Sequence, residues 1–372
     1  MTERARREHI LPLTSLRGLA AVMIMLFHVR YAFREIQPFN YWIFEFKIFN
    51  KGYLWVDFFF LLSGYLLSMR YFTGDGISNK EYGRFITQRF RRIFPVSIMM
   101  TMVFVLATGF IKNWSFVTDN FTSIVANLTL THAWGFYFAK DWNSPSWSLS
   151  AEWGAYVLFP ILVYFERITG DFVQKIFLSF GLWGFLFWIS ATYHNYSLDL
   201  TTHHGLWKCL IEVTLGILAS KIGDGFEEFF AQESISMEKS WDFLAAFTFL
   251  GILVHLYVGA PDILMVPLAG GLITFSAKAR GTWKMVMSHY VPVFLGKISF
   301  SIFMVHAFVC FLFENSYKYW VAEPLSIGYG TFLFFLVVGV VIGLSCLSYY
   351  LVEEYFMGQR TYDLPSQEEE AA

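Results

Sequence analysis

Charged residues are scarce in this chain: only 15% of its 372 residues are Asp, Glu, Lys or Arg, against about 25% in soluble globular proteins. Its 27 lysines and arginines are balanced by 29 acidic residues, so no basic face is expected and a nucleic-acid-binding function is excluded. The three cysteines, Cys209, Cys310 and Cys346, lie in apolar runs without metal-ligand spacing. We interpret them as small core residues and expect no metal site.

Apolar residues are abundant instead, at 56% of the chain with a mean hydropathy of +0.48, which is typical of a polytopic membrane protein. Apolar windows of about 20 residues predict an all-α fold with about ten transmembrane helices. They lie near 13–33, 53–72, 93–112, 147–166, 174–193, 206–222, 241–259, 261–278, 296–315 and 328–352. A weaker run, 121–137, contains Asn127 and His132 and is predicted to be interfacial or re-entrant rather than an eleventh span.

The distribution of basic residues predicts that both termini are cytoplasmic. With the N-terminus inside, 18 of the 27 lysines and arginines fall on the cytoplasmic side and 8 on the other, with Arg17 within the membrane. The first apolar run follows Arg4, Arg6 and Arg7 as a signal peptide would. It has no A-x-A-like cleavage site before Phe33, so we interpret it as a retained helix.

No sizeable polar segment interrupts this pattern, so we predict one transmembrane domain over residues 1–356. The remaining residues, 357–372, form a short acidic tail that is expected to be disordered. Function must therefore reside within or beside the membrane.

Ionisable residues inside the predicted spans mark the candidate site. Arg17 and His28 are eleven residues apart, about three helical turns, so they share one helix face at points about 16 Å apart. The topology places Asp57 and Glu152 at a height similar to that of His28, toward the outer surface, and His306 near mid-bilayer. Because ionisable groups at membrane depth are costly to bury, such residues indicate function by default.

The residue types suggest group transfer. The segment RFRRIFP, at the inner end of the third span, contains Arg89 and Arg92, and arginines bind phosphates through charge-assisted hydrogen bonds. A histidine near a carboxylate can remove a proton from a hydroxyl group, because its pKa is near the operating pH. A phosphorylated donor entering beside Arg17 would reach His28 along one helix face.

Structural interpretations of the same residues stay open. The arginine run could serve only as a topology anchor, and Asp57 and Glu152 could be structural partners of Arg17 or of a broken helix. His28 could be an interhelical hydrogen-bonding residue, and His306 could have a structural or gating role. A proton-coupled transporter or flippase of a glycan or lipid, with these groups as proton relays, is the alternative function. No paired repeats of the kind common in transporters are visible.

Five ordered motifs resemble the acyltransferase-3 family of integral membrane acyltransferases, which includes bacterial O-acetyltransferases of surface and exported polysaccharides. The resemblance covers roughly residues 10–356. The motifs are, in chain order, LTSLRGLAAVMIMLFH, VDFFFLLSGY, RFRRIFP, WSLSAEW and GKISFSIFMVH.

The resemblance implies an O-acyltransferase in the bacterial cytoplasmic membrane. It would move an acyl group from cytoplasmic acyl-CoA to a hydroxyl of a glycan or glycolipid. The expected donor is acetyl-CoA, and another acyl-CoA is the alternative. By position, Arg17 and His28 match the family's Arg-x10-His pair, in which the histidine is the proposed catalytic residue. The remaining matches are Arg89 and Arg92 with the acyl-CoA-linked RxxR element, Glu152 with the acidic residue of WSLS-x-E, Asp57 and Ser63 with DxFFxLSG, and His306 with the late histidine.

Two departures from the family pattern shape the expectation. Some relatives carry a C-terminal hydrolase-like domain that this sequence lacks, so we expect it to act alone or with a separate polysaccharide-biosynthesis protein. Val29 and Arg30 directly follow His28, so the carboxylate that orients the histidine is expected to be Asp57 or Glu152.

Overall fold

The computed structural model describes residues 3–36, 43–71, 77–135, 142–201, 203–232, 238–320 and 325–357, and these contain helices but no strand. The longer helices are α1 (Glu3–Ala32), α3 (Trp55–Tyr71), α4 (Asn79–Ile111), α7 (Ser146–Val157), α8 (Phe159–Ile168), α9 (Phe172–Tyr193), α10 (Gly205–Gln232), α11 (Glu238–Val258), α12 (Met265–Lys278), α15 (Ser299–Trp320) and α16 (Ile327–Ser348). Shorter elements are α5 (Trp114–Asp119), α6 (Phe121–Leu128), α13 (Thr282–Met287), α14 (Tyr290–Lys297), α17 (Glu354–Met357) and the one-turn segments η1 (Lys47–Phe49), η2 (Gly52–Leu54), η3 (Asp262–Leu264) and η4 (Tyr349–Glu353). All of the predicted acidic tail except Met357 lies outside the described residues.

Every predicted span falls on helical residues, with 147–166 divided between α7 and α8, which confirms an all-α polytopic fold. Among the residues that the structure describes, seven helices are long and apolar enough to cross a bilayer by themselves, and α7 with α8 forms an eighth candidate bent by 61°. The other two predicted spans are α10, which is long but more polar, and α12, whose 14 residues are fewer than the roughly 20 a perpendicular crossing needs. The weak run beginning at Phe121 forms α6, an eight-residue helix too short to span.

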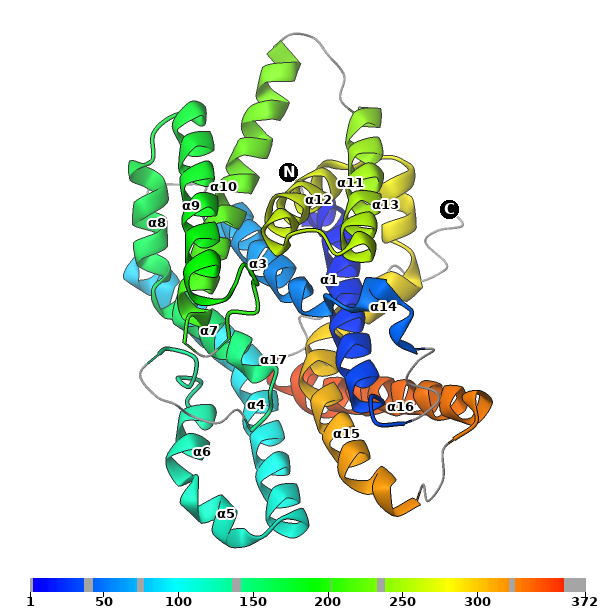
Figure 1. The fold of residues 1–372 in the computed structure, drawn as a ribbon. Helices are drawn as coiled ribbons and strands as arrows, with labels where there is room; N and C mark the ends of the chain where they lie inside the picture. Colours follow the sequence, from blue (N-terminus) through cyan, green and yellow to red (C-terminus); the bar gives the residue numbers. More distant parts are fainter. Residues whose placement is uncertain are drawn as a thin grey trace.

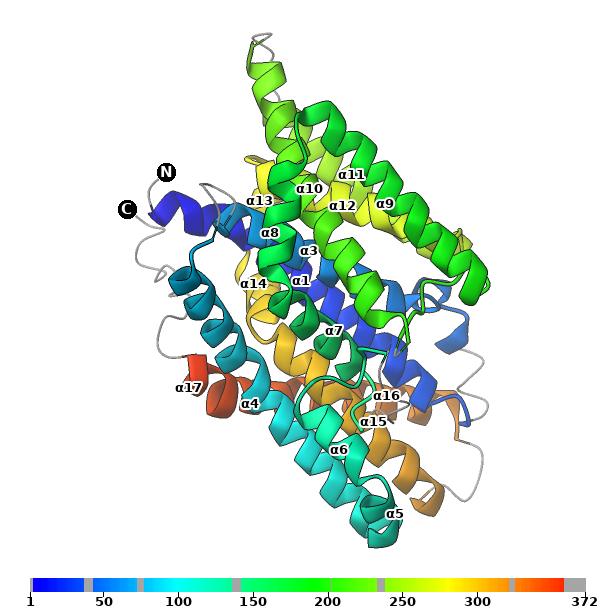
Figure 2. The same ribbon diagram turned by 90° about the vertical axis from the view of Figure 1, so that its left-hand side faces the viewer.

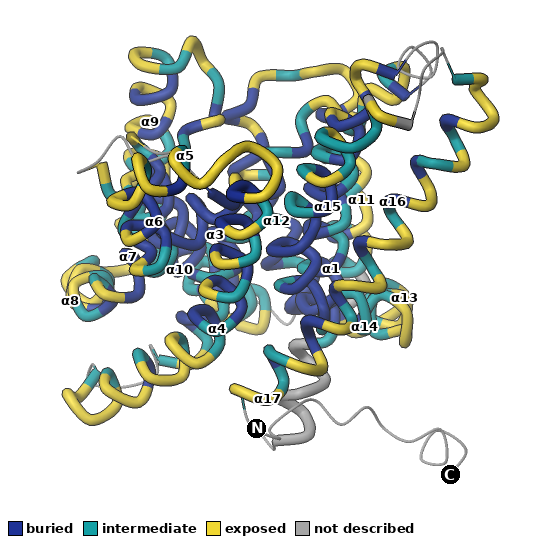
Figure 3. The backbone as a smooth tube through the Cα atoms, turned by 90° about the horizontal axis from the view of Figure 1, so that it is seen from below, coloured by how far each residue is buried: buried dark blue, intermediate teal, exposed yellow. Residues whose placement is uncertain are grey.

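Helix α1 lies at the centre of the bundle, against α3, α12, α14 and α15 (Figure 1). Buried residues concentrate around α1, α3 and α10, whereas α8, α9 and α16 expose one side at the periphery (Figure 3). The start of α1 and α17 lie on the same side (Figure 2), as an even number of crossings requires. We call this the inner side and the opposite one the outer side; that the inner side is cytoplasmic stays a prediction from the charges.

Glycines bring two helix pairs into backbone contact. A Cβ on Gly18 of α1 would lie 2.5 Å from the backbone N of Gly296 in α14, and one on Gly296 would lie 2.0 Å from Thr14 O. On the other side of the bundle, Gly64 of α3 and Gly216 of α10 allow the same close approach, because a Cβ on Gly216 would lie 2.0 Å from Leu61 O. Small residues are how membrane helices approach closely without a hydrophobic driving force between them.

The outer loops are joined by one buried carboxylate, Asp262, which is only 4% exposed. Lys51 Nζ donates to Asp262 Oδ1 at 2.6 Å, while Tyr53 OH and the Leu198 N–H donate to Oδ2 at 2.7 and 3.0 Å. Burial alone would raise the pKa of this carboxyl, but the hydrogen bonds from Lys51 and Tyr53 outweigh it, so the pKa lies below its ordinary value of 3.8. Asp262 therefore stabilises the outer loops as a carboxylate.

We predict that Asp262→Asn lowers the free energy of unfolding by about 2 kcal/mol or more at neutral pH, because these donors, and Ser197 Oγ at 3.3 Å from Oδ2, lose a charged acceptor. Since the folded pKa is depressed, the wild-type advantage is fully present above the unfolded pKa of about 3.9 and is lost as the pH falls through the folded pKa. Thermal unfolding in detergent across this pH range measures both effects. Asp199→Asn is the control, because Asp199 is an exposed carboxylate in the neighbouring loop; equal losses in both variants would contradict the prediction.

Candidate functional site

Predicted site residues from four helices gather at one cavity of about 110 Å³ between α1, α3, α4, α7 and α15, which we call the inner cavity. Its polar lining consists of Arg17, Ser63, Arg89, Arg92, Ser148, Glu152, Tyr156 and Ser299. Five of these eight, Arg17, Ser63, Arg89, Arg92 and Glu152, were expected from the sequence. The structure thus joins the arginine segment and the WSLSAEW motif into one site.

Two of the arginines are held in defined positions. Arg17 donates from Nη2 to Gly296 O at 2.8 Å and from Nε to Ser299 Oγ at 3.0 Å, so it bridges α1 to the α14–α15 junction. The close approach at Gly18 is what brings Gly296 O within its reach. The Arg89 guanidinium lies over the ring of Tyr156, 5.1 Å from its centroid.

Glu152 does not reach toward His28 but is part of a network in the inner cavity. Tyr156, one turn further along α7, donates its hydroxyl to Glu152 Oε1, and its oxygen lies 3.0 Å from Ser63 Oγ of α3. Tyr156 was not expected from the sequence. Its spacing of four residues from Glu152 on a helix is the signal that would have found it.

A second unexpected residue is Glu353, a 3% exposed carboxylate in the π-helical turn η4. It accepts a hydrogen bond of 3.0 Å from Ser301 Oγ, and the charges of Arg92 and Arg17 act on it. π-Helical turns are rare in proteins overall, and those that occur are often at functional sites. A glutamate at the inner end of an otherwise apolar last span was the available sequence signal.

His28 pairs with His306, not with a carboxylate. His306 Nε2 lies 3.2 Å from His28 Nδ1, and the ring centroids are 4.9 Å apart. His306 Nδ1 also lies 3.0 Å from Ile302 O, and His28 Nδ1 lies 3.0 Å from Ile24 O. The expectation that Asp57 or Glu152 orients His28 is therefore not met, since its two hydrogen-bond partners are a histidine and a carbonyl.

These acceptors determine the tautomers of the neutral pair. A carbonyl oxygen can only accept, so Nδ1 of His306 carries a proton and its Nε2 is an acceptor. The neighbours of His28 Nδ1 are then Ile24 O and that acceptor nitrogen, so Nδ1 of His28 also carries a proton. The lone pair of His28 is left on Nε2, the nitrogen a general base would use.

His28 lines a second cavity of about 390 Å³ toward the outer side, which we call the outer cavity. Its walls are rich in aromatic residues, including Tyr31, Phe116 and Trp142, with the Phe116 and Trp142 rings 6.1 Å apart. Polar groups at this cavity include Thr108, Lys112, Ser144 and Glu314. Its volume is within the range of small-molecule sites.

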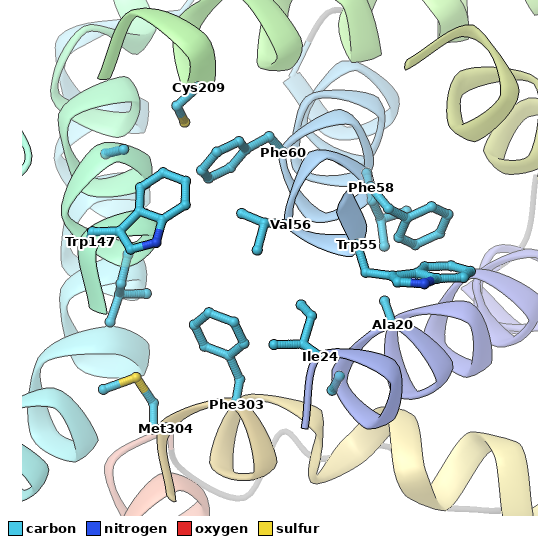
Figure 4. Packing of buried hydrophobic residues seen from close by; sticks show 14 of the residues in the cluster. Ala20, Ile24, Trp55, Val56, Phe58, Phe60, Trp147, Cys209, Phe303 and Met304 are labelled. Carbon is cyan, nitrogen blue, oxygen red and sulfur yellow. The ribbon is translucent and has the colours of Figure 1, made fainter. Parts of the chain in front are cut away.

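An apolar partition lies between the inner cavity and the histidine pair. Phe303 of α15 and Phe59 of α3 both line the inner cavity, with ring centroids 5.8 Å apart, and the Phe303 centroid lies 6.0 Å from that of His306. Figure 4 shows Phe303 and Ile24 pointing into the same packed region as Val56 and Trp147. Groups bound at the arginines would meet His28 only past these side chains.

Asp57 lies outside both cavities. It is fully buried, and its Oδ1 is 3.0 Å from Nζ of Lys208 in α10, a lysine that is only 1% exposed. Lys208 also donates to Leu198 O at 2.6 Å, and buried Glu212 lies one turn further along α10. Asp57 thus joins α3 to α10 and to an outer loop. The described residues contain no group of three metal-ligating side chains.

A helical bundle that places arginines, a histidine and carboxylates around two cavities defines a polytopic membrane protein with an intramembrane polar site. The chain belongs to the acyltransferase-3 family, whose model, described as an acyltransferase domain, matches residues 12–350.

The similar proteins are distant from this chain in sequence. A Staphylococcus aureus protein named "Putative O-acetyltransferase SACOL0978" is 22% identical over 95% of this chain and 58% of its own length. The Listeria monocytogenes "Peptidoglycan O-acetyltransferase OatA" is 24% identical over 49% of this chain and 29% of its own length. The chain therefore spans less than two thirds of these relatives. No solved structure matches it.

We predict that Asp57→Asn and Lys208→Met each lower the free energy of unfolding by about 3 kcal/mol, because each leaves a buried partner without its counter-charge. The double variant should lose less than the sum of the two by about 1 kcal/mol or more. Thermal unfolding of the four proteins measures the coupling. Glu35→Gln, in an exposed pair with Arg34, serves as the control and should be near neutral; strict additivity at the buried pair would contradict the assignment.

Proposed function

We propose that the protein transfers an acetyl group from cytoplasmic acetyl-CoA to a hydroxyl group of a cell-surface or exported glycan, within the bacterial cytoplasmic membrane. The observation that carries this proposal is the His28–His306 pair, which leaves a basic nitrogen at the outer cavity while arginines line the inner one. The family and the names of the O-acetyltransferase relatives support acyl transfer to oxygen. The name of the Listeria relative supports a glycan acceptor.

The inner cavity is the proposed donor site. Arg89 and Arg92 would bind the phosphates of CoA by charge-assisted hydrogen bonds, and Arg17, anchored at Gly296, would hold the phosphate or the thioester arm. Glu152 and Ser63 are linked through Tyr156. They would form hydrogen bonds with the amide groups of the CoA arm. The acyl end would then pass Phe59 and Phe303 to reach His28.

The outer cavity is the proposed acceptor site. Sugar rings present apolar faces and hydroxyl edges, and this cavity offers aromatic walls together with Ser144, Lys112 and Glu314. Handing the acyl group to a larger polysaccharide assembly would involve a separate biosynthetic protein.

His28 would act as general base. Its Nε2 takes the proton of the acceptor hydroxyl as that oxygen attacks the thioester carbonyl carbon; the carbon–sulfur bond breaks, and the imidazolium returns the proton to the CoA thiolate. His306 orients the ring by accepting from Nδ1–H, which is the role a carboxylate has in many such sites. Asp57 is outside this scheme and acts through the position of α3. His28 and the two carboxylates do not form a continuous chain of contacts, which disfavours a proton relay for transport.

We expect His28→Ala to abolish acceptor-dependent CoA release by purified protein in membranes supplied with acetyl-CoA and a glycan extract, because Nε2 of His28 is the proposed base at the reacting hydroxyl. His306→Leu should lower kcat by about 100-fold or more with little change in donor KM, whereas His306→Gln, which can still accept from His28, should recover part of the rate. Full transfer by the His28 variant would reject the proposed function. Equal losses in Leu and Gln variants would reject the orienting role.

We expect Arg92→Ala to raise the KM for acetyl-CoA by about tenfold or more, as loss of a charged phosphate contact worth at least about 1.4 kcal/mol would do. The acceptor KM should change little. Arg91→Ala is a matched control, since this exposed neighbour is not part of the inner cavity. Steady-state kinetics with each substrate varied separates the two; equal effects at both positions would indicate a role in membrane topology instead.

A further inference from the structure

A third cavity, independent of the donor and acceptor sites, lies between α9, α10 and α12 and has a volume of about 490 Å³. We call it the α9/α12 groove. Its lining is almost entirely apolar and includes Phe180, Trp183, Leu215, Val266 and Phe275. Leu61 of α3 also lines it, so only the thickness of α3 separates the groove from the inner cavity.

The groove opens toward the hydrocarbon of the bilayer. Helix α9, one of its walls, is a candidate membrane span of which only 11% of the apolar window is buried, and Figures 2 and 3 show it at the edge of the bundle. An apolar cavity offers water too few hydrogen-bond partners to be filled by it. On the facing wall, α12 has Gly270 and Gly271, which carry no side chain into the groove. A Cβ on Gly270 would have no atom within 4 Å, so this position is open.

The length and depth of the groove match one leaflet. Along α10 it extends from Leu215 to Phe226, eleven residues or about 16 Å, whereas the hydrocarbon core of a bilayer is about 30 Å thick. Because α10 runs from the outer to the inner side, most of these residues belong to its inner half. An acyl chain of the inner leaflet would therefore lie alongside the groove.

Charged residues of both signs lie at the inner end of the groove. A Cβ on Gly223, which lines it, would lie 3.0 Å from Lys278 Cε. Lys278 Nζ lies 2.9 Å from Asp224 Oδ1 and 2.8 Å from Glu227 Oε2, and Arg280 Nη2 lies 3.2 Å from Glu227 Oε1. Two cations and two carboxylates at headgroup depth complement a headgroup that carries both a phosphate and an ammonium group.

We propose that the α9/α12 groove binds one phospholipid of the inner leaflet with a zwitterionic headgroup of the phosphatidylethanolamine class. One acyl chain lies in the groove beside Gly270. The phosphate contacts Lys278 or Arg280, and the ammonium group contacts Asp224 or Glu227. The site does not depend on the proposed acyl transfer, since none of its residues lines the inner or outer cavity.

The test uses the full-length protein in phosphatidylglycerol vesicles containing a phosphatidylethanolamine probe with a diazirine in one acyl chain. After irradiation, mass spectrometry of the peptides should locate the label on the segments of α9, α10 and α12 that line the groove. Gly270→Trp places a large side chain at the wall of the groove, where a Cβ meets no atom within 4 Å, and should reduce this labelling by about tenfold or more, equivalent to at least about 1.4 kcal/mol. Gly339→Trp is the matched control, because Gly339 of α16 is also open and lies outside the groove.

Labelling of wild-type protein spread over α16 and the other exposed helices would overturn the proposal, and this measurement does not depend on how any variant folds. Equal labelling of Gly270→Trp and wild type would also overturn it, as would a copurifying protein segment in the groove. A phosphatidylglycerol probe with the same diazirine chain should label the groove several-fold less. Equal labelling by both probes would overturn the headgroup assignment.

Discussion

The structure depends on the requirement that Arg17, Asp57 and Glu353, at the contacts between its helices, have partners, since an isolated charge in a medium of low polarity is too costly to bury. Arg17 meets this requirement with Gly296 O and Ser299, and Asp57 meets it with Lys208. Glu353 accepts from Ser301. Each of these contacts joins residues far apart in the sequence. The polar groups therefore gain their partners only when the helices pack together.

Backbone proximity makes these partnerships possible. Arg17 reaches Gly296 O because Gly18 and Gly296 let α1 and α14 touch, and Lys208 reaches Asp57 on the α3–α10 interface that Gly64 and Gly216 bring together. A side chain larger than hydrogen at these glycines would force the helices apart. The polar contacts therefore depend on the small residues. Apolar contact alone does little to hold helices together inside a membrane, so the helices associate through close packing and hydrogen bonds.

The resulting architecture separates two chemical environments along α1. Arginines surround the inner cavity, aromatic rings surround the outer one, and the His28–His306 pair lies beyond the Phe59–Phe303 partition. The proposed reaction, which joins a cytoplasmic CoA donor to a glycan hydroxyl group, would use such a separation, with its base at the boundary. The pairing of two histidines orients the ring of His28 without bringing a further charge into the membrane.

The sequence alone predicted the ten helical segments, because runs of about 20 apolar residues have few structural alternatives in a bilayer. It also named five of the eight polar residues that line the inner cavity, and His28 at the outer one, but it missed Tyr156 and Glu353. It assigned the wrong partners: His28 was expected beside Asp57 or Glu152, whereas the structure pairs it with His306, Asp57 with Lys208 and Glu152 with Tyr156. The position of a residue within a span predicts its depth in the membrane. Which helix faces contact each other depends instead on how each helix is rotated and at what angle it crosses its neighbours. Only the tertiary structure decided those, because they are set by contacts between helices such as those at Gly18 and Gly216, which no local pattern encodes.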